Sequence, residues 1–100
     1  MEDDQITFTH DRIVYRIDPH IWRDYPDRTG LVTVERIRDT VQSPDFEEDE
    51  TDSTKILWKW FPELGRRGNY IKVIVEIEET HREITTSHPD SSMRNRMGAP

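Results

Sequence analysis

The stretch 69–87 shows the most regular alternation of apolar and polar positions in the chain. Alternation of this kind is typical of a half-buried β-strand, because successive side chains point to opposite faces. A turn follows, and a second strand over 82–87 would place Ile84 and Thr86 on one face. The pattern therefore predicts a hairpin at the centre of an antiparallel sheet. The apolar positions of its first strand are Ile71, Val73, Val75 and Ile77.

Three further stretches have the composition of strands. Residues 54–61 (TKILWKWF) are rich in aromatic residues and are apolar on both sides apart from Lys59, which predicts an interior strand. Residues 6–9 alternate over a short length and predict a brief strand near the N-terminus. Residues 12–17 alternate as well, although the same residues are compatible with a helical turn.

Two helices are predicted between these strands. Asp18 is suited to cap a short helix over 19–25, because proline fits the first helical position and a second proline follows the segment. Thr33 is the candidate cap of a longer helix that ends at Gln42, before Ser-Pro. The apolar stripe of that longer helix consists of Val34, Ile37 and Val41.

One hundred residues, 32% hydrophobic and 35% charged, are enough for one domain with one modest core. We expect a single α+β domain over 1–100 that contains an antiparallel sheet. Residues 1–4 are predicted to be frayed, 45–53 to form an acidic loop, and 89–100 to form a polar tail.

Charge and composition restrict the function classes. The net charge is −7, and residues 45–52 hold six of the acidic residues and no base, so the remainder is −7 + 6 = −1. This balance argues weakly against nucleic-acid binding. The absence of cysteine excludes disulfides and zinc–thiolate sites. The acidic start does not resemble a signal peptide, and no apolar run approaches the roughly 20 residues of a membrane helix, so we expect a cytoplasmic protein that makes no membrane contact.

The histidines and acidic residues do not predict a metal site. No pair of histidines has HxH or HExxH spacing, and a scattered histidine is usually a surface residue. The acidic loop could attract a divalent cation but lacks the DxDxDG pattern, so a solvated loop is the simpler interpretation. P-loop, GxGxxG and GxSxG motifs are absent, and no cofactor is predicted. Two histidines have more informative positions: His20 begins the first helix, and His88 follows the last strand.

Aromatic and basic residues of the second half suggest a nucleic-acid surface. Alternation places Lys59 on the opposite side of its strand from the two neighbouring tryptophans. Aromatic rings beside cations on a sheet can bind single-stranded RNA by stacking and phosphate contacts, although aromatic residues on strands are more often part of a core. The candidate RNA-binding residues are Trp58, Trp60, Arg66, Arg67 and Arg94.

The succession of short segments along the chain resembles a known family. The segments are ITFTHDRI (6–13), WRDYPD (22–27), VERIRDTVQSPDF (34–46), ILWKWF (56–61), YIKVIVEI (70–77) and EITTSHPDSSM (83–93). Each segment is short, and only their order across nearly the whole chain is specific. This order is similar to that of small phage- and bacteria-borne nuclease-like domains in the barnase/EndoU/RelE-like superfamily.

The resemblance implies a fold in which one or two N-terminal helices pack on a twisted antiparallel sheet of about four strands. It also implies metal-independent RNA cleavage, often by the toxin half of a toxin–antitoxin pair, so RNA and a cognate antitoxin are the implied partners. Such chemistry needs a base, an acid and a cation. The chain departs from the family where the usual histidine before proline is Tyr25, because a tyrosine is a poor base at neutral pH. His20 or His88 would then substitute for it. The candidate catalytic residues are His20, Tyr25, Lys59, Thr86 and His88.

A non-catalytic interaction module is the alternative. In that case the same fold would bind a protein partner through the exposed side of the aromatic strand. Convergence of a histidine, Lys59 and Thr86 in one concave patch would favour catalysis. A flat apolar patch with these groups scattered would favour the module.

Overall fold

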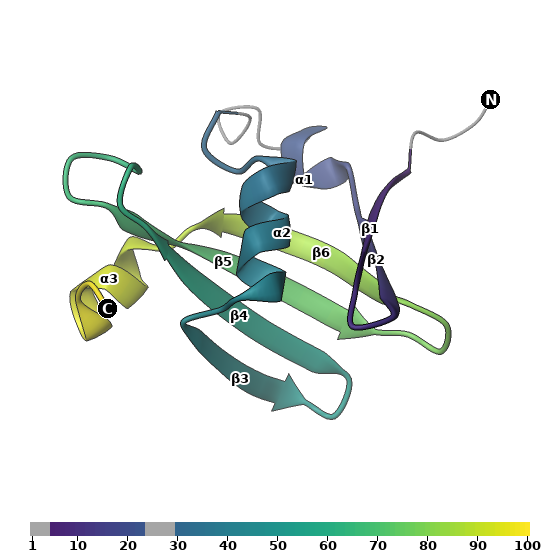
Figure 1. Cartoon of the computed structure of the whole chain (residues 1–100). Helices are drawn as coiled ribbons and strands as arrows, with labels where there is room; N and C mark the ends of the chain where they lie inside the picture. The colour runs from purple at the N-terminus through teal and green to yellow at the C-terminus, as the bar shows by residue number, and fades with distance from the viewer. Residues whose placement is uncertain (1–4, 24–29) are drawn as a thin grey trace.

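The computed structural model describes residues 5–23 and 30–100, and there it contains one six-stranded sheet and three short helices (Figure 1). The predictions for residues 1–4 and for the end of the first helix lie outside this part. The strands are β1 (Ile6–His10), β2 (Ile13–Ile17), β3 (Phe46–Thr51), β4 (Thr54–Phe61), β5 (Asn69–Ile77) and β6 (Arg82–Pro89). The helices are α1 (His20–Arg23), α2 (Val34–Gln42) and α3 (Ser91–Met97).

The strand order is β1-β2-β6-β5-β4-β3, and β2 pairs with β6 in parallel while the other neighbours are antiparallel. The prediction of a helix-covered antiparallel sheet of about four strands was therefore wrong. Two features of the sheet explain the difference. The segment expected to be an acidic loop forms β3, which pairs with β4 through its backbone, and the N-terminal hairpin joins the sheet through the parallel β2–β6 pair.

The central strands β4, β5 and β6 pair with one another as the alternation predicted. One face of these strands, here called the helix-covered face, packs against α2 (Figure 1). Thr33 caps α2, since its Oγ1 accepts a hydrogen bond from the Arg36 N–H at 3.1 Å. The buried core on this side combines residues of α2 with residues of the sheet, among them Ile37, Val41, Leu57, Ile71, Val73, Val75 and Ile84.

The opposite face, here called the outer face, is partly covered by α3. The predicted polar tail thus contains a helix, and Asp90 caps its N-terminus, because the Asp90 side chain accepts a hydrogen bond from the Met93 N–H. Met93 is the buried residue of α3 and packs on Ile56, Trp58 and Tyr70. The helix forms because a small apolar cluster on the outer face gives Met93 a site for burial.

A β-bulge changes which side chains of β6 share a face. Val75 pairs with Ile84, whereas Ile74 pairs with Thr86, so Thr85 is an extra residue in the ladder. Ile84 consequently lies in the helix-covered core, and Thr86 lies on the outer face with Ile74. The prediction that Ile84 and Thr86 share a face was wrong, because strict two-residue alternation does not account for the extra residue of a bulge.

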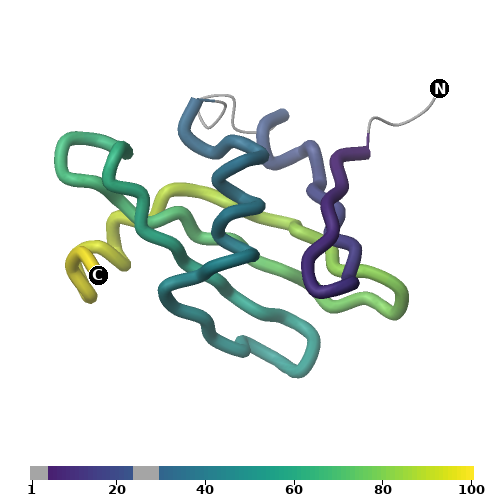
Figure 2. The backbone as a smooth tube through the Cα atoms, in the orientation of Figure 1, coloured from purple at the N-terminus to yellow at the C-terminus, as the bar shows by residue number. Residues whose placement is uncertain are grey.

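The N-terminal segment adopts the strand interpretation over 12–17, since β2 covers Ile13–Ile17. The β1–β2 turn holds Asp11 and Arg12 at positive φ angles of 53° and 67°, as two-residue hairpin turns require. Figure 2 shows this hairpin beside α2 at one end of the sheet. None of the helices that the structure describes has both the length and the apolar character needed to cross a membrane.

Candidate outer-face site

Lys72, Thr86 and His88 come together on the outer face. Lys72 of β5 is paired directly with His88 of β6, and the next outer-face pair joins Ile74 to Thr86. Side chains that are opposite one another in an antiparallel pair have Cβ atoms about 4.5–5.5 Å apart. All three polar side chains are partly exposed. An imidazole, an ammonium group and a hydroxyl therefore lie as neighbours on an accessible surface.

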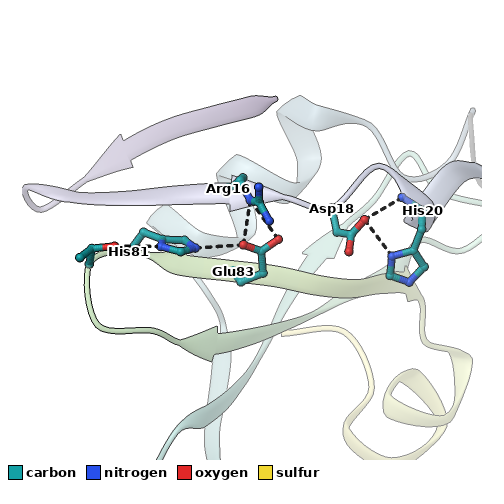
Figure 3. Close-up of polar contacts among 6 residues, drawn as sticks. Arg16, Asp18, His20, His81 and Glu83 are labelled. Carbon is teal, nitrogen blue, oxygen red and sulfur yellow. Dashed lines mark hydrogen bonds and ion pairs between the residues drawn. The ribbon is translucent and has the colours of Figure 1, made fainter. Parts of the chain in front are cut away.

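His20 reaches the same strand from α1 and is oriented by a carboxylate. Asp18 Oδ1 lies 3.0 Å from His20 Nδ1 and accepts the His20 backbone N–H at 3.0 Å (Figure 3). The Asp18 N–H donates to the Ile84 carbonyl at 3.0 Å, and α1 contacts β6, so the pair sits beside the β6 segment that leads into Thr86. An imidazole held by a carboxylate has a defined ring orientation, as a general base requires.

The charge state of Asp18 follows from these contacts. The hydrogen bond from the His20 backbone N–H, helped by the His20 ring and the Arg16 guanidinium, lowers the pKa of Asp18 below its ordinary value, although burial opposes this. Asp18 is therefore a carboxylate at neutral pH. The ionised Asp18 side chain is the group that holds the His20 ring in its orientation.

A second histidine–carboxylate pair on β2 and β6 is part of a tie between the two strands. Glu83 accepts two hydrogen bonds from Arg16 Nε, at 2.9 and 3.2 Å, and its Oε1 lies 3.0 Å from His81 Nε2 (Figure 3). The Glu83 side chain is only 12% exposed. Arg16 and Glu83 are also register partners, so these contacts hold the N-terminal hairpin, and with it His20, against β6.

Asp90 connects α3 to the outer-face site. Its Oδ2 accepts a hydrogen bond from Trp58 Nε1 at 2.9 Å, and its Oδ1 accepts the Met93 N–H at 3.1 Å. Burial alone would raise the pKa of Asp90, but these two hydrogen bonds and the nearby positive charge of Lys72 and His88 bring it below its ordinary value. The Lys72 ammonium also lies 5.9 Å from the centre of the Trp58 ring.

Substitution of Asp90 by alanine is expected to lower the free energy of unfolding by about 2 kcal/mol at pH 7, because α3 loses its cap and the buried Trp58 N–H loses its acceptor. Urea denaturation measures the change. The pKa of Asp90 is lower in the folded state than in the unfolded state, where it is about 4. The ionised side chain therefore stabilises the fold at pH values above the unfolded-state pKa, and this stabilisation is lost as the pH falls through the folded-state pKa. The difference between wild type and variant should therefore shrink in acid. Asp52→Ala, in an exposed turn, is the control, and a loss of equal size in both variants would contradict this role.

The structure separates Lys59 from the other sequence candidates. Lys59 pairs with Ile71 on the helix-covered face, and its Nζ donates to the Ser43 carbonyl at 3.1 Å. It therefore does not lie in one patch with Thr86 and His88, and the convergence of a histidine, Lys59 and Thr86 that would have favoured catalysis does not occur. Tyr25 lies outside the described residues. Of the five candidate catalytic residues, Thr86 and His88 lie on β6, and His20 lies on α1, which contacts that strand.

The candidate RNA-binding residues divide into buried rings and exposed cations. Trp58 is 6% exposed, and the Trp60 ring packs edge-on against Tyr70 with ring centres 5.1 Å apart. Arg66 and Arg67 are exposed in the β4–β5 loop, and Arg94 of α3 donates to the Gly68 carbonyl in the same loop. The arginines are thus placed at one end of the sheet, whereas the tryptophans are mainly packing residues.

Three residues of this site were missing from the sequence prediction. Asp18 was interpreted only as a helix cap, although its spacing of two residues from His20 could have indicated the pair. Lys72 shares its face with Trp58 by strand register, which becomes visible only once β4 and β5 are paired. Asp90 lies in the segment that was expected to be a polar tail.

Comparisons with known proteins do not assign this chain to a family. No family model matches it, and neither the curated proteins nor the solved structures yield a match. Within residues 5–23 and 30–100, no group of three histidine, aspartate or glutamate side chains is placed to hold a metal ion. The functional argument therefore rests on the outer-face site itself, defined here as Asp18, His20, Lys72, Thr86, His88 and Asp90.

Proposed function

We propose that the chain is a small endoribonuclease that cleaves RNA without a metal ion at the outer-face site. One observation carries the proposal: the strand β6, which bears Thr86 and His88 beside Lys72 of β5, also holds the Asp18–His20 pair through the hydrogen bond from the Asp18 N–H to the Ile84 carbonyl. Cleavage of RNA by attack of a 2′-hydroxyl requires a base for that hydroxyl, an acid for the leaving oxygen and positive charge for the phosphate.

The residues divide naturally among these roles. His20 is the base, because Asp18 orients its ring. His88 is the acid, and its register partner Lys72 supplies positive charge for the phosphate oxygens. Thr86 can donate a hydrogen bond to the same phosphate. The attack forms a 2′,3′-cyclic phosphate and releases a 5′-hydroxyl, so the proton taken by one histidine is balanced by the proton that the other donates.

The cations near the start of β5 extend the site along an RNA backbone. Arg66 and Arg67 are exposed in the preceding loop, and Arg94 is fixed to that loop through the Gly68 carbonyl. The alternative, an interaction module that uses the aromatic strand, has less structural support. Among the described residues, the large apolar side chains that are exposed are Val14, Leu31 and Met97, and none of them belongs to β4.

The reaction class predicts a sharp difference between substrates. Purified protein should cleave a single-stranded RNA in EDTA and leave a 2′,3′-cyclic phosphate on the upstream product. The same oligonucleotide with every 2′-hydroxyl replaced by hydrogen should remain intact, because the nucleophile is missing. Gel electrophoresis and mass spectrometry of the products measure both outcomes. Cleavage of the deoxy oligonucleotide, or no cleavage of any RNA by the folded chain, would contradict the proposal.

A further inference from the structure

The free edge of β3 forms a second surface, remote from the chemistry of the outer face. β3 is the last strand in the sheet order, so within the described part of the chain one side of its backbone faces no other strand (Figure 1). An extended peptide can add to such an edge through main-chain hydrogen bonds. The edge is accessible, because every β3 residue after Phe46 is exposed.

The charge of β3 limits the kind of segment that fits this edge. Four consecutive acidic residues, Glu47 to Glu50, lie on the strand, and their side chains project alternately to the two sides of the sheet. Lys55 of β4 lies 3.3 Å from Glu47 and 3.8 Å from Asp49. Because one lysine cannot balance four carboxylates, the strand keeps a net negative charge. An added strand of basic residues would be attracted, and an acidic strand or a nucleic acid would be repelled.

A pocket beside β3 adds a specific feature to the charged edge. It lies on the helix-covered side between β3, the end of α2 and the β1–β2 turn, and its volume is about 340 Å³. Apolar walls of the pocket are formed by Val41, Pro44 and Leu57, beside the Tyr15 ring. The lining also contains two carboxylates, each beside a partner: Glu47 lies 3.3 Å from Lys55, and Asp11 lies 3.5 Å from His10. The two carboxylates outnumber the single lysine of the lining, so the pocket can still take one basic side chain, whose aliphatic stem would pack on the apolar walls while its charged end reaches the carboxylates.

We propose that the β3 edge binds an extended, basic segment of a protein partner, with one arginine or lysine side chain of that segment in the adjacent pocket. Glu47 connects the two features, since it belongs to the edge strand and also lines the pocket. Main-chain hydrogen bonds would provide affinity, and the pocket would select the basic side chain. This proposal concerns a different surface from the outer-face site and does not depend on RNA cleavage.

A labelled eight-residue peptide of alternating arginine and valine, measured by fluorescence anisotropy at low salt, tests the proposal. A peptide with alternate backbone amides methylated keeps the charge but cannot complete the ladder, so it should bind at least about tenfold more weakly. The double variant Glu48→Gln/Glu50→Gln should bind the parent peptide several-fold more weakly. The matched double variant Glu35→Gln/Glu79→Gln, which removes the same charge from exposed positions elsewhere, should bind it as the wild type does.

The pocket is tested with Glu47→Gln. Wild-type protein should prefer the parent peptide about tenfold over one whose central arginine is glutamine, and Glu47→Gln should lose most of that preference. Equal binding of the methylated peptide, equal weakening by the two double variants, or an arginine preference that survives in Glu47→Gln would each overturn the proposal. Circular dichroism confirms that each variant is folded before its binding is compared.

Discussion

Replacement of His20 by alanine is expected to lower the rate constant for RNA cleavage by about 10²–10⁴-fold, which is the usual contribution of a general acid or base. His20 is the imidazole that Asp18 orients at 3.0 Å beside the Thr86 segment of β6. Single-turnover cleavage of the RNA used above measures the effect. The wild-type pH–rate profile should be bell-shaped, because one histidine must be neutral and the other protonated, and the variant should lose one limb.

His81→Ala is a matched control for this prediction. His81 also lies 3.0 Å from a carboxylate, that of Glu83, but it precedes β6 at the end away from His88. We expect its loss to leave the cleavage rate within about twofold, because it removes no residue of the outer-face site and leaves in place the Arg16–Glu83 ion pair that ties β2 to β6. Equal losses in the two histidine variants would show a general structural effect. A loss on Lys59→Ala without a loss on Lys72→Ala would move the chemistry to the helix-covered face, and either result would contradict the assignment.

Replacement of Gly68 by alanine is expected to destabilise the fold by about 3 kcal/mol, the sum of a left-handed backbone cost and overpacking. Gly68 has φ +85°, and an added Cβ would lie 2.9 Å from Trp60 Cε2 and 3.0 Å from the Pro62 Cα. Trp60 cannot move aside easily, because its ring packs against the fully buried Tyr70. Urea denaturation followed by tryptophan fluorescence measures the loss.

Gly65→Ala separates the two contributions to that cost. Gly65 also has a positive φ, +67°, but an added Cβ there would meet no atom within 4 Å. Replacement of Gly65 should therefore lower the free energy of unfolding by about 1 kcal/mol, which is the cost of the left-handed backbone alone. If both alanine variants lost the same stability, the contact between position 68 and the Trp60 ring would not be the cause. The Gly68 variant should also weaken RNA binding, because Arg94 is attached to the Gly68 carbonyl.

The local elements with strong patterns were predicted well. Residues 54–61 form β4 with the predicted bounds, and α2 begins after Thr33 and ends at Gln42 as its cap, stripe and following Ser-Pro indicated. The hairpin of β5 and β6 also occurs. These features depend on side-chain periodicity and capping, which act over a few residues and can be read from neighbouring positions.

β3 and α3 could not be predicted in the same way. The acidic residues of β3 have no apolar alternation, and this strand exists because β4 offers it a backbone ladder. The short α3 exists because Met93 is buried on Ile56, Trp58 and Tyr70. Segments of this length gain most of their stability from tertiary contacts, and their own sequences carry little signal.

By itself, the sequence determined which segments are extended or helical at the centre of the fold, and it supplied His20, Thr86 and His88 as candidates. Only the tertiary structure decided which of them share a face. The parallel β2–β6 pair brings Asp18 and His20 to β6, the bulge turns Thr86 outward, and strand register puts Lys72, and not Lys59, opposite His88. A shift of one residue reverses every side chain of a strand, so the composition of a sheet site depends on pairing between distant segments.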